Sequence, residues 1–262
     1  MGTSRRLRVP RPRYGEGVSS VSINRSGHLT RRAAIVLGVQ TALAAVAADA
    51  PPLDGLTFHT EPGRLRIPVD EAAQGLRWKV ERDAAGTVTA VNGYPVPPGS
   101  LRLMIDGTPL ADMDDLRRWG AAVVAGPDAR TATVQHRRRE FTLVAGPQRV
   151  EVSLGAQRLR AWQGDRLVLE TRISSGRKRG STPTGRFRAG PFRARMHYSS
   201  RYQRAPMPWS VQIYGHVFIH GFTSVPDYPA SHGCIRVPLT GGNPARFFYE
   251  WVETGTPVHV VT

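Results

Sequence analysis

The only cysteine of the chain, Cys234, lies in the segment Ser231–Arg236, among residues that can activate a thiol. A lone cysteine cannot form an internal disulfide, so it is either packed in a core or chemically reactive. His232 and Arg236 lie two positions before and after it, and a nearby imidazole or guanidinium favours the thiolate, which is the nucleophilic form. Gly233 lets the backbone pass close to a substrate, so that N–H groups around Cys234 can hold an oxyanion. The segment therefore predicts a cysteine nucleophile.

A second histidine, His220, lies in the run Val211–Phe222, which alternates as a half-buried strand does. His216 and His220 fall on one face of this expected strand, which we expect to end at His220 and Gly221. A loop containing proline and serine then leads to Cys234, and it is long enough to bring the two side chains within hydrogen-bond reach. The spacing predicts a nucleophile with a general base, and we expect the two to form a thiolate–imidazolium pair before substrate binds.

Three motifs, spread over roughly residues 150–262, resemble the L,D-transpeptidases of the YkuD family. In order, they are an opening hairpin at Gln157–Asp165, a Thr-Pro-x-Gly-x-Phe segment at Thr182–Phe187 that follows Ser174–Gly176, and the signature formed by His220–Gly221 with Ser231–Arg236. Val237–Leu239 stands where polar residues are more usual in the family, a departure that concerns the substrate-facing rim. The resemblance implies a β-sandwich domain that acts on peptidoglycan.

The resemblance also implies the reaction. Cys234 would attack the carbonyl at the L-centre of a stem tetrapeptide and release D-alanine through a thioester, with His220 as general acid and base. A diaminopimelate amine would accept the acyl group. Water as acceptor would make the enzyme an L,D-carboxypeptidase, and a protein lysine would make it a lipoprotein-anchoring enzyme, so the acceptor stays open. No cofactor is expected.

The remaining residues of the signature have expected supporting roles. The backbone N–H of Cys234 would hold the oxyanion, with Gly233 allowing its approach, and His232 would shape the site or steer protons. A main-chain carbonyl near Gly221 would orient the imidazole of His220. Substrate contacts are expected from four residues, with a core position as the alternative for the last: Ser231, Arg236, Gly221 and Tyr214.

Two alternatives of other classes compete with this interpretation. His216 and His220 share a strand face, and His232 and Cys234 are also two residues apart, so the four are plausible zinc ligands. Structural zinc usually takes more cysteines, and catalytic zinc needs a general base beside its bound water, so we expect no metal. A non-catalytic module that binds the cell wall is the second alternative, and the combination of nucleophile, base and glycine argues against it.

The net charge of +16 is distributed unevenly. Residues 150–262 carry fifteen basic and six acidic residues, whereas residues 33–149 carry thirteen of each. Between Arg172 and Pro226 there are ten basic residues and no acidic one. Such a stripe suits an anionic polymer, either nucleic acid or peptidoglycan, whose stem peptides carry carboxylates. The sequence has no helix-turn-helix, zinc-finger or aromatic RNA-binding motif, so we expect stem peptides and no nucleic acid as partners.

Residues 1–47 have the pattern of an export signal. An arginine-rich stretch precedes the uncharged run Ala33–Ala47, which ends in the small residues Ala45-Val46-Ala47. Thr30-Arg31-Arg32 resembles a twin-arginine signal, although Ala34 stands where a bulky residue is usual, so general secretory export remains an alternative. The run is short for a membrane helix. We expect export to the periplasm or cell wall, with an uncleaved leader as the only membrane attachment.

Two further segments precede the catalytic region. Residues 48–55 contain prolines and predict a linker, and residues 56–145 predict a small α+β module with a weak internal repeat. Val69–Val80 parallels Met113–Val124, and each copy is interpreted as a short helix opened by acidic residues and followed by a strand. The module resembles the copper amine oxidase N-terminal-like module, a name that does not imply copper. We expect it to be a spacer or a wall-binding unit.

Residues 149–262 predict the catalytic domain, in which short strands are separated by turns. Strands are expected at Val150–Leu154, Gln157–Trp162, Arg166–Ile173, Thr184–Ala189, Val211–His220 and Pro257–Val261. Asn243 predicts an N-cap and Pro244 the first position of one late helix. Together with the resemblance, this pattern predicts a mostly β protein: an L,D-transpeptidase-type β-sandwich with one late helix, preceded by the α+β repeat module.

Overall fold

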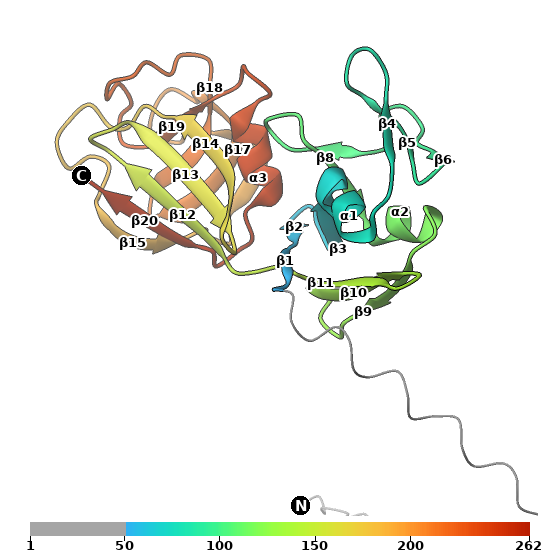
Figure 1. The fold of residues 1–262 in the computed structure, drawn as a ribbon. Helices are drawn as coiled ribbons and strands as arrows, with labels where there is room; N and C mark the ends of the chain where they lie inside the picture. The colour runs from blue at the N-terminus through green and yellow to red at the C-terminus, as the bar shows by residue number, and fades with distance from the viewer. Residues whose placement is uncertain (1–50) are drawn as a thin grey trace, which may run out of the picture. The chain divides into compact units, whose positions relative to one another are not determined.

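The computed structural model describes residues 51–262, and the strand-rich fold expected from the sequence is confirmed over that range (Figure 1). The signal-peptide interpretation concerns residues 1–47, which lie outside the described residues. No helix in the described range is long and apolar enough to cross a membrane.

Two sheets form the carboxy-terminal domain. The first has the strand order β14-β13-β12-β20-β15 and the second the order β16-β17-β18-β19. The strands of the first sheet are β12 (Gln148–Ser153), β13 (Arg158–Gln163), β14 (Arg166–Arg172), β15 (Gly185–Arg188) and β20 (Pro257–Val261). Those of the second are β16 (Arg193–Tyr198), β17 (Pro206–Tyr214), β18 (Val217–Phe222) and β19 (Ile235–Pro238).

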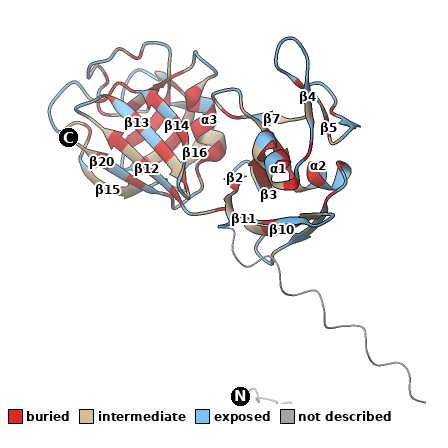
Figure 2. Ribbon diagram, viewed as in Figure 1, coloured by how far each residue is buried: buried red, intermediate tan, exposed pale blue. Residues whose placement is uncertain are grey.

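Alternation along the strands places one face of each sheet in a shared core. In β13, for example, Leu159 and Ala161 are buried and the flanking arginines are exposed, a pattern visible as red and blue patches in Figure 2. Val152 of the first sheet and Ile219 of the second belong to the same buried cluster. The two sheets therefore pack face to face as a β-sandwich, with strands that alternate between core and solvent.

The late helix, α3 (Pro244–Trp251), forms where the sequence predicts it. The Asn243 side chain accepts a hydrogen bond from the Arg246 N–H at 3.0 Å, and Pro244 occupies the first helical turn, where a missing N–H costs nothing. Phe248 and Trp251 are fully buried against the sandwich. Because α3 packs on β18, it supports one of the two strands that build the site described below.

One expected strand is in fact a hairpin. The run Val211–His220 was expected to be continuous, but the chain turns at Gly215 and His216, so that β17 ends at Tyr214 and β18 begins at Val217. Gly215 has a φ of +48°, which a glycine adopts without steric cost. His216 therefore lies in the turn and not on the strand face that carries His220.

In the amino-terminal module each copy of the repeat begins with a helix, α1 (Val69–Leu76) or α2 (Met113–Arg118), and a strand follows, β4 (Val80–Arg82) or β9 (Ala122–Ala125). The strands that precede the two helices, β3 (Glu61–Pro68) and β8 (Pro109–Asp112), pair with each other and were not predicted. The remaining strands are β1 (Leu53–Asp54), β2 (Leu56–Phe58), β5 (Val88–Val91), β6 (Tyr94–Pro95), β7 (Arg102–Leu103), β10 (Thr131–His136) and β11 (Arg139–Val144).

The predicted linker at residues 48–55 is not entirely a linker. Leu53–Asp54 forms β1, which pairs in parallel with β11. In the register of this pair, Leu53 lies opposite Leu143. The next strand, β2, contributes Leu56 and Phe58 to the buried cluster of the carboxy-terminal domain. The chain thus contributes to both hydrophobic cores before the repeat begins, which composition alone does not indicate.

Candidate active site

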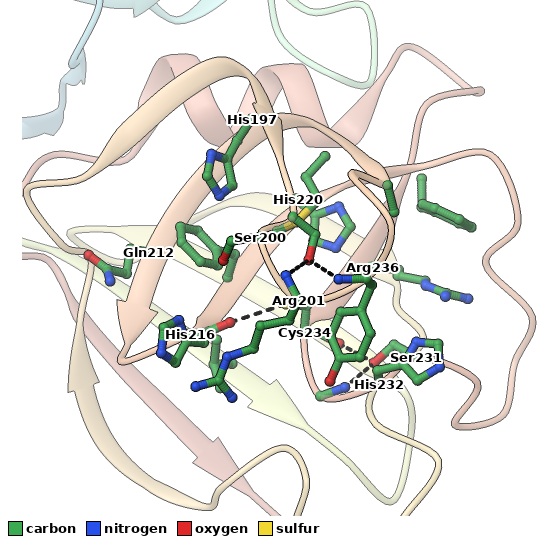
Figure 3. Close-up of a pocket in the computed structure, with 18 of the residues that line it drawn as sticks. His197, Ser200, Arg201, Gln212, His216, His220, Ser231, His232, Cys234 and Arg236 are labelled. Carbon is green, nitrogen blue, oxygen red and sulfur yellow. Dashed lines mark hydrogen bonds between the residues drawn. The ribbon is translucent and has the colours of Figure 1, made fainter.

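The parallel pairing of β18 with β19 brings the predicted nucleophile and base together. His220 lies opposite Arg236 in the register of the two strands, so their side chains point to the same face of the sheet. Cys234 is two residues before Arg236, directly ahead of β19, and by the period of two it shares that face. The side chains of His220, Cys234 and Arg236 accordingly line one cleft (Figure 3).

This cleft has a volume of about 400 Å³ and opens over the end of the second sheet. Of the eight residues expected to act in catalysis or substrate binding, six line it: His220, Ser231, His232, Gly233, Cys234 and Arg236. His216, named above as a possible zinc ligand, lines it as well. The other two of the eight do not. Gly221 is buried next to Leu239 and Ala245, and Tyr214 at the end of β17 packs its exposed ring against Phe187 at a centroid distance of 5.3 Å.

His220 is held in one orientation by its own neighbour. Its Nδ1 donates a hydrogen bond to the Gly221 carbonyl oxygen at 2.9 Å, which leaves Nε2 as the unprotonated nitrogen. The side chain is only 4% exposed, and burial lowers its pKa to about 4. A Cβ at Gly221 would lie 2.4 Å from the side chain of Leu239 and 3.2 Å from Ala245 on α3. Glycine is therefore required for β18 to pack against α3.

The nucleophile loop, residues 231–234, is held by its own hydrogen bonds. Ser231 Oγ accepts from the Gly233 N–H at 3.0 Å and donates to the Cys234 carbonyl at 2.6 Å. The Ser231 backbone also pairs with the segment after β14, because its N–H donates to Ser175 and its carbonyl accepts from Arg177. Ser231 therefore shapes the loop from beneath, a structural contact in addition to its expected contact with substrate.

The Thr-Pro-x-Gly segment supports the same loop from the other side. Thr182 Oγ1 donates to the Gly233 carbonyl at 2.7 Å and accepts from the Gly176 N–H at 2.8 Å. Gly233 has a φ of +147°, and a Cβ there would come within 2.7 Å of the Ser181 carbonyl oxygen. Only glycine fits this position. The sequence motifs at 174–187 and 231–236 are thus two sides of one hydrogen-bonded unit.

The thiol of Cys234 lies in an environment that favours its neutral form. Burial raises its pKa, against the smaller opposing effects of a hydrogen bond from the Phe218 backbone and the charge of Arg236. Its Sγ lies 3.5 Å from the His216 carbonyl oxygen. Burial thus lowers the pKa of His220 and raises that of Cys234, and both shifts favour a neutral thiol and a neutral imidazole. The sequence predicts a thiolate–imidazolium pair instead, because it does not record the cost of burying both charges.

His232 is held between two residues that the sequence did not single out. The ring of Tyr202 stacks on it at a centroid distance of 4.4 Å, and a guanidinium nitrogen of Arg177 lies 3.3 Å from its Nε2. Because a guanidinium only donates, Nε2 accepts and the ring proton resides on Nδ1. These two contacts therefore hold the imidazole ring of His232 in place, where it forms part of the cleft wall.

The far wall of the cleft was not predicted. It comes from β16 and from the loop between β16 and β17, and includes His197, Arg201 and Tyr202. The ring of His197 lies 5.2 Å from that of Phe218, which is two residues from His220 on β18. A signal was present in the sequence, since residues 192–204 are rich in aromatic and basic side chains. These residues form no recognisable motif, and only the pairing of β16 with β17 shows which of them line the cleft.

The zinc alternative finds no support in the geometry. No group of three or more histidine, cysteine or acidic side chains arranged to hold a metal ion occurs within residues 51–262. His216 lies in the hairpin turn, His232 is engaged by Arg177, and the Nδ1 of His220 is engaged by the Gly221 carbonyl.

Comparison with protein families assigns the carboxy-terminal domain. Residues 147–260 match the family model of the L,D-transpeptidase catalytic domain, YkuD. This match does not extend to the upstream module, so the resemblance of residues 56–145 to the copper amine oxidase N-terminal-like module is unsupported. No match was found among curated proteins.

Solved structures of L,D-transpeptidases are similar to parts of the chain. An L,D-transpeptidase from Xylanimonas cellulosilytica is 30% identical over 45% of this chain and 61% of its own, with a TM-score of 0.38. The chain thus spans less than two thirds of that relative. The E. faecium catalytic domain, solved acylated by ertapenem, is 26% identical over 44% of this chain and 98% of its own, with a TM-score of 0.35. One from Mycobacterium smegmatis is 15% identical over 81% of this chain and 100% of its own, with a TM-score of 0.40.

The three motifs found in the sequence lie within the residues that the family model matches. The described fold is the strand-rich one that both imply. Residues 147–260 of the chain therefore match the catalytic domain of the L,D-transpeptidase (YkuD) family.

Proposed function

We propose that the protein is a peptidoglycan L,D-transpeptidase in which Cys234 transfers an acyl group from a stem tetrapeptide to an amine acceptor. The observation that carries the proposal is the register of β18 with β19, which puts His220 and Cys234 on one face of the same cleft. The proposed product is a cross-link or a remodelled stem in the cell wall.

The neutral resting pair sets the order of proton transfers. Nε2 of His220 takes the thiol proton as Sγ attacks the carbonyl at the L-centre, so charge develops only while the new carbon–sulfur bond forms. The tetrahedral intermediate collapses, the carbon–nitrogen bond breaks, and His220 gives the proton to the departing D-alanine amine. The acceptor amine then attacks the thioester, and His220 takes its proton and returns it to sulfur.

The oxyanion would be held by the backbone N–H of Cys234. That N–H donates to no acceptor in the described part of the chain, so it is free to bind an oxygen that becomes negative. The Ser231 and Thr182 bonds that fix the loop would hold this donor in place before substrate arrives. Such preorganised donors are worth roughly 3–4 kcal/mol of transition-state stabilisation each.

The site of action follows from the substrate. Peptidoglycan lies outside the cytoplasm, and the charged and apolar pattern of residues 1–47 supports export to the periplasm or cell wall. Amino-terminal sequencing of protein taken from the cell envelope tests this part of the proposal. A mature chain that begins near Ala48 supports cleavage, and one that begins near Met1 supports an uncleaved anchor.

Product analysis tests the reaction. Purified protein is incubated with a disaccharide-tetrapeptide, alone and with a diaminopimelate-containing acceptor, and the products are analysed by mass. A cross-linked dimer that appears with the wild type and not with Cys234→Ala supports the proposal. Loss of D-alanine without a dimer assigns the L,D-carboxypeptidase reaction, and transfer to a lysine-bearing peptide assigns the lipoprotein-anchoring reaction. Turnover by Cys234→Ala contradicts the cysteine mechanism.

A further inference from the structure

The cleft is cationic and, within the described residues, has no carboxylate in its wall. Its lining includes Arg201, Arg236 and four histidines, and neither aspartate nor glutamate. Asp227 is the only acidic residue between Thr171 and Tyr249 in the sequence. A low-dielectric cleft lined by charge of one sign concentrates ligands of the opposite sign. The wall is therefore suited to an anionic group, and it offers no partner for an ammonium group.

Two cations lie beside the nucleophile loop: Arg236, which lines the cleft, and Arg177, which contacts the cleft residue His232 from outside the lining. Arg177 reaches His232 Nε2 at 3.3 Å, and the guanidinium of Arg236 stacks on the Phe222 ring at 4.1 Å from its centroid. Arg236 is also close enough to Cys234 for its charge to act on the thiol. Each guanidinium thus lies against a ring, and its remaining donors form no hydrogen bond within the described residues, so they can bind a ligand.

These two cations have no counter-ion in the part of the chain that the structure describes. Neither Arg177 nor Arg236 forms a salt bridge with any residue in the described range 51–262. The backbone brings them near each other: Arg236 exchanges two hydrogen bonds with Ser174, three residues before Arg177, whose own N–H donates to the Ser231 carbonyl. The charge of Arg177 accordingly adds to burial in lowering the pKa of Arg236. A carboxylate bound between them would relieve this repulsion and accept charge-assisted hydrogen bonds from both.

We propose that Arg177 and Arg236 form a carboxylate subsite beside Cys234, which binds the terminal carboxylate of the residue that leaves the donor stem. This inference rests on the proposed function for the identity of the peptide. The terminal carboxylate of a donor lies one residue beyond the scissile carbonyl, about 3.8 Å along the chain. Arg236 lies two residues beyond Cys234 on a strand, about 6.6 Å along it, a span that its long side chain can cover. Arg177 is then a specificity-determining residue that selects donors ending at this position.

A pair of alkylating reagents tests the subsite without any turnover. Iodoacetate and iodoacetamide both react with the thiolate, but only iodoacetate carries a carboxylate. Since Cys234 is the only cysteine, both label one known atom. The quantity measured is the ratio of the two rates, divided by the same ratio for 2-mercaptoethanol, so that the thiol pKa cancels. We expect a preference for iodoacetate of about tenfold at low salt, which falls as salt screens the charges.

Matched variants locate the effect. Arg177→Gln removes one exposed guanidinium beside the nucleophile loop and is expected to lower the iodoacetate preference about threefold or more. Arg186→Gln removes the same charge from β15 in the first sheet and should leave the preference unchanged. A wild-type ratio equal to that of 2-mercaptoethanol would overturn the subsite. So would an equal loss in the two variants, because it would show a diffuse field and not a local site.

Donor peptides test the assignment to the terminal carboxylate. The wild type is compared on a tetrapeptide donor with a free terminal carboxylate and on the same donor ended by a carboxamide. We expect KM to be about tenfold lower for the carboxylate donor, and Arg177→Gln to lose most of that difference. Equal KM values for the two donors in the wild type would overturn the proposal. No turnover of either donor would instead contradict the proposed transpeptidation, and the alkylation ratio would still decide whether the subsite exists.

Discussion

His220 Nδ1 lies 2.9 Å from the main-chain carbonyl oxygen of Gly221, the next residue of the chain. A carbonyl can only accept, so this contact fixes the tautomer in which Nε2 carries the lone pair. The orientation of the base therefore needs no carboxylate, which suits a cleft wall that has none among its described residues. It depends instead on how tightly β18 packs against α3 at Gly221.

Gly221→Ala is expected to destabilise the domain and to displace the base. The added Cβ would lie 2.4 Å from the side chain of Leu239, and overpacking of this kind costs about 1–3 kcal/mol. Thermal unfolding and kcat/KM measure the two effects. Leu239→Ala in the same chain removes the first clash and should restore part of the stability. If the double variant is no more stable than the sum of the single variants predicts, the steric explanation is wrong.

Thr182→Val should impair the nucleophile loop. The substitution keeps the side-chain shape but removes the hydroxyl that joins the Gly176 N–H to the Gly233 carbonyl, and each buried group left unpaired costs about 1–3 kcal/mol. We expect a lower kcat/KM together with a lower unfolding temperature. Thr184→Val, at an exposed position of the same motif, is the matched control and should change neither quantity by much.

A carbapenem should acylate Cys234 if the proposed L,D-transpeptidase function is correct. Intact-protein mass is expected to rise by one drug adduct in the wild type. Cys234→Ala should show no adduct and should unfold at nearly the wild-type temperature, because the thiol donates only one long hydrogen bond. An adduct that persists in this variant would place the nucleophile at another residue.

The strands of the β-sandwich, the late helix and the presence of Cys234 and His220 in one cleft were predictable because each depends on local chemistry. The alternation of apolar and polar residues along β12–β14 and β20 indicates which face of each strand is buried. The Asn243-Pro244 pair indicates where α3 begins. Cys234 and His220 stood out as the single thiol and a nearby imidazole. The hairpin at Gly215 and His216 was missed because apolar residues alternate on both sides of the turn, so the period gave no break.

The far wall of the cleft and the protonation state of the pair were beyond local reasoning. Tyr202 and His197 reach the cleft only because β16 pairs with β17, a long-range fact that no single segment records. The neutrality of the Cys234–His220 pair depends on how much water the finished fold excludes, and the charges near each residue in the sequence indicated the opposite.

Burial of His220 should make the fold sensitive to acid. The folded-state pKa of about 4 lies below the ordinary value of 6.5, so the neutral ring contributes stability above pH 6.5 that is lost as the pH falls toward 4. The difference corresponds to roughly 3 kcal/mol by linkage. Denaturant unfolding of the wild type should therefore weaken over that interval more than that of His220→Gln. The matched control His259→Gln, at an exposed position of β20, should follow the wild type. Parallel curves for wild type and His220→Gln would contradict the buried neutral imidazole.

The rate at which iodoacetamide alkylates Cys234 should report the neutral pair directly. A resting thiolate–imidazolium pair would give a plateau of reactivity below the ordinary thiol pKa, which is about 8.5 for a free cysteine. Because burial raises the pKa of Cys234, we expect the rate instead to fall steadily as the pH drops, with its midpoint above the ordinary thiol range. The same burial keeps His220 uncharged across this interval, so His220→Ala should leave the shape of the profile nearly unchanged while it lowers turnover by about 10²–10⁴. The alkylation profile and the turnover of His220→Ala together distinguish two mechanisms. In one, His220 takes the thiol proton during attack on the substrate; in the other, it has already taken the proton in the resting enzyme. A plateau at neutral pH that disappears in His220→Ala would show that the ion pair exists before substrate binds.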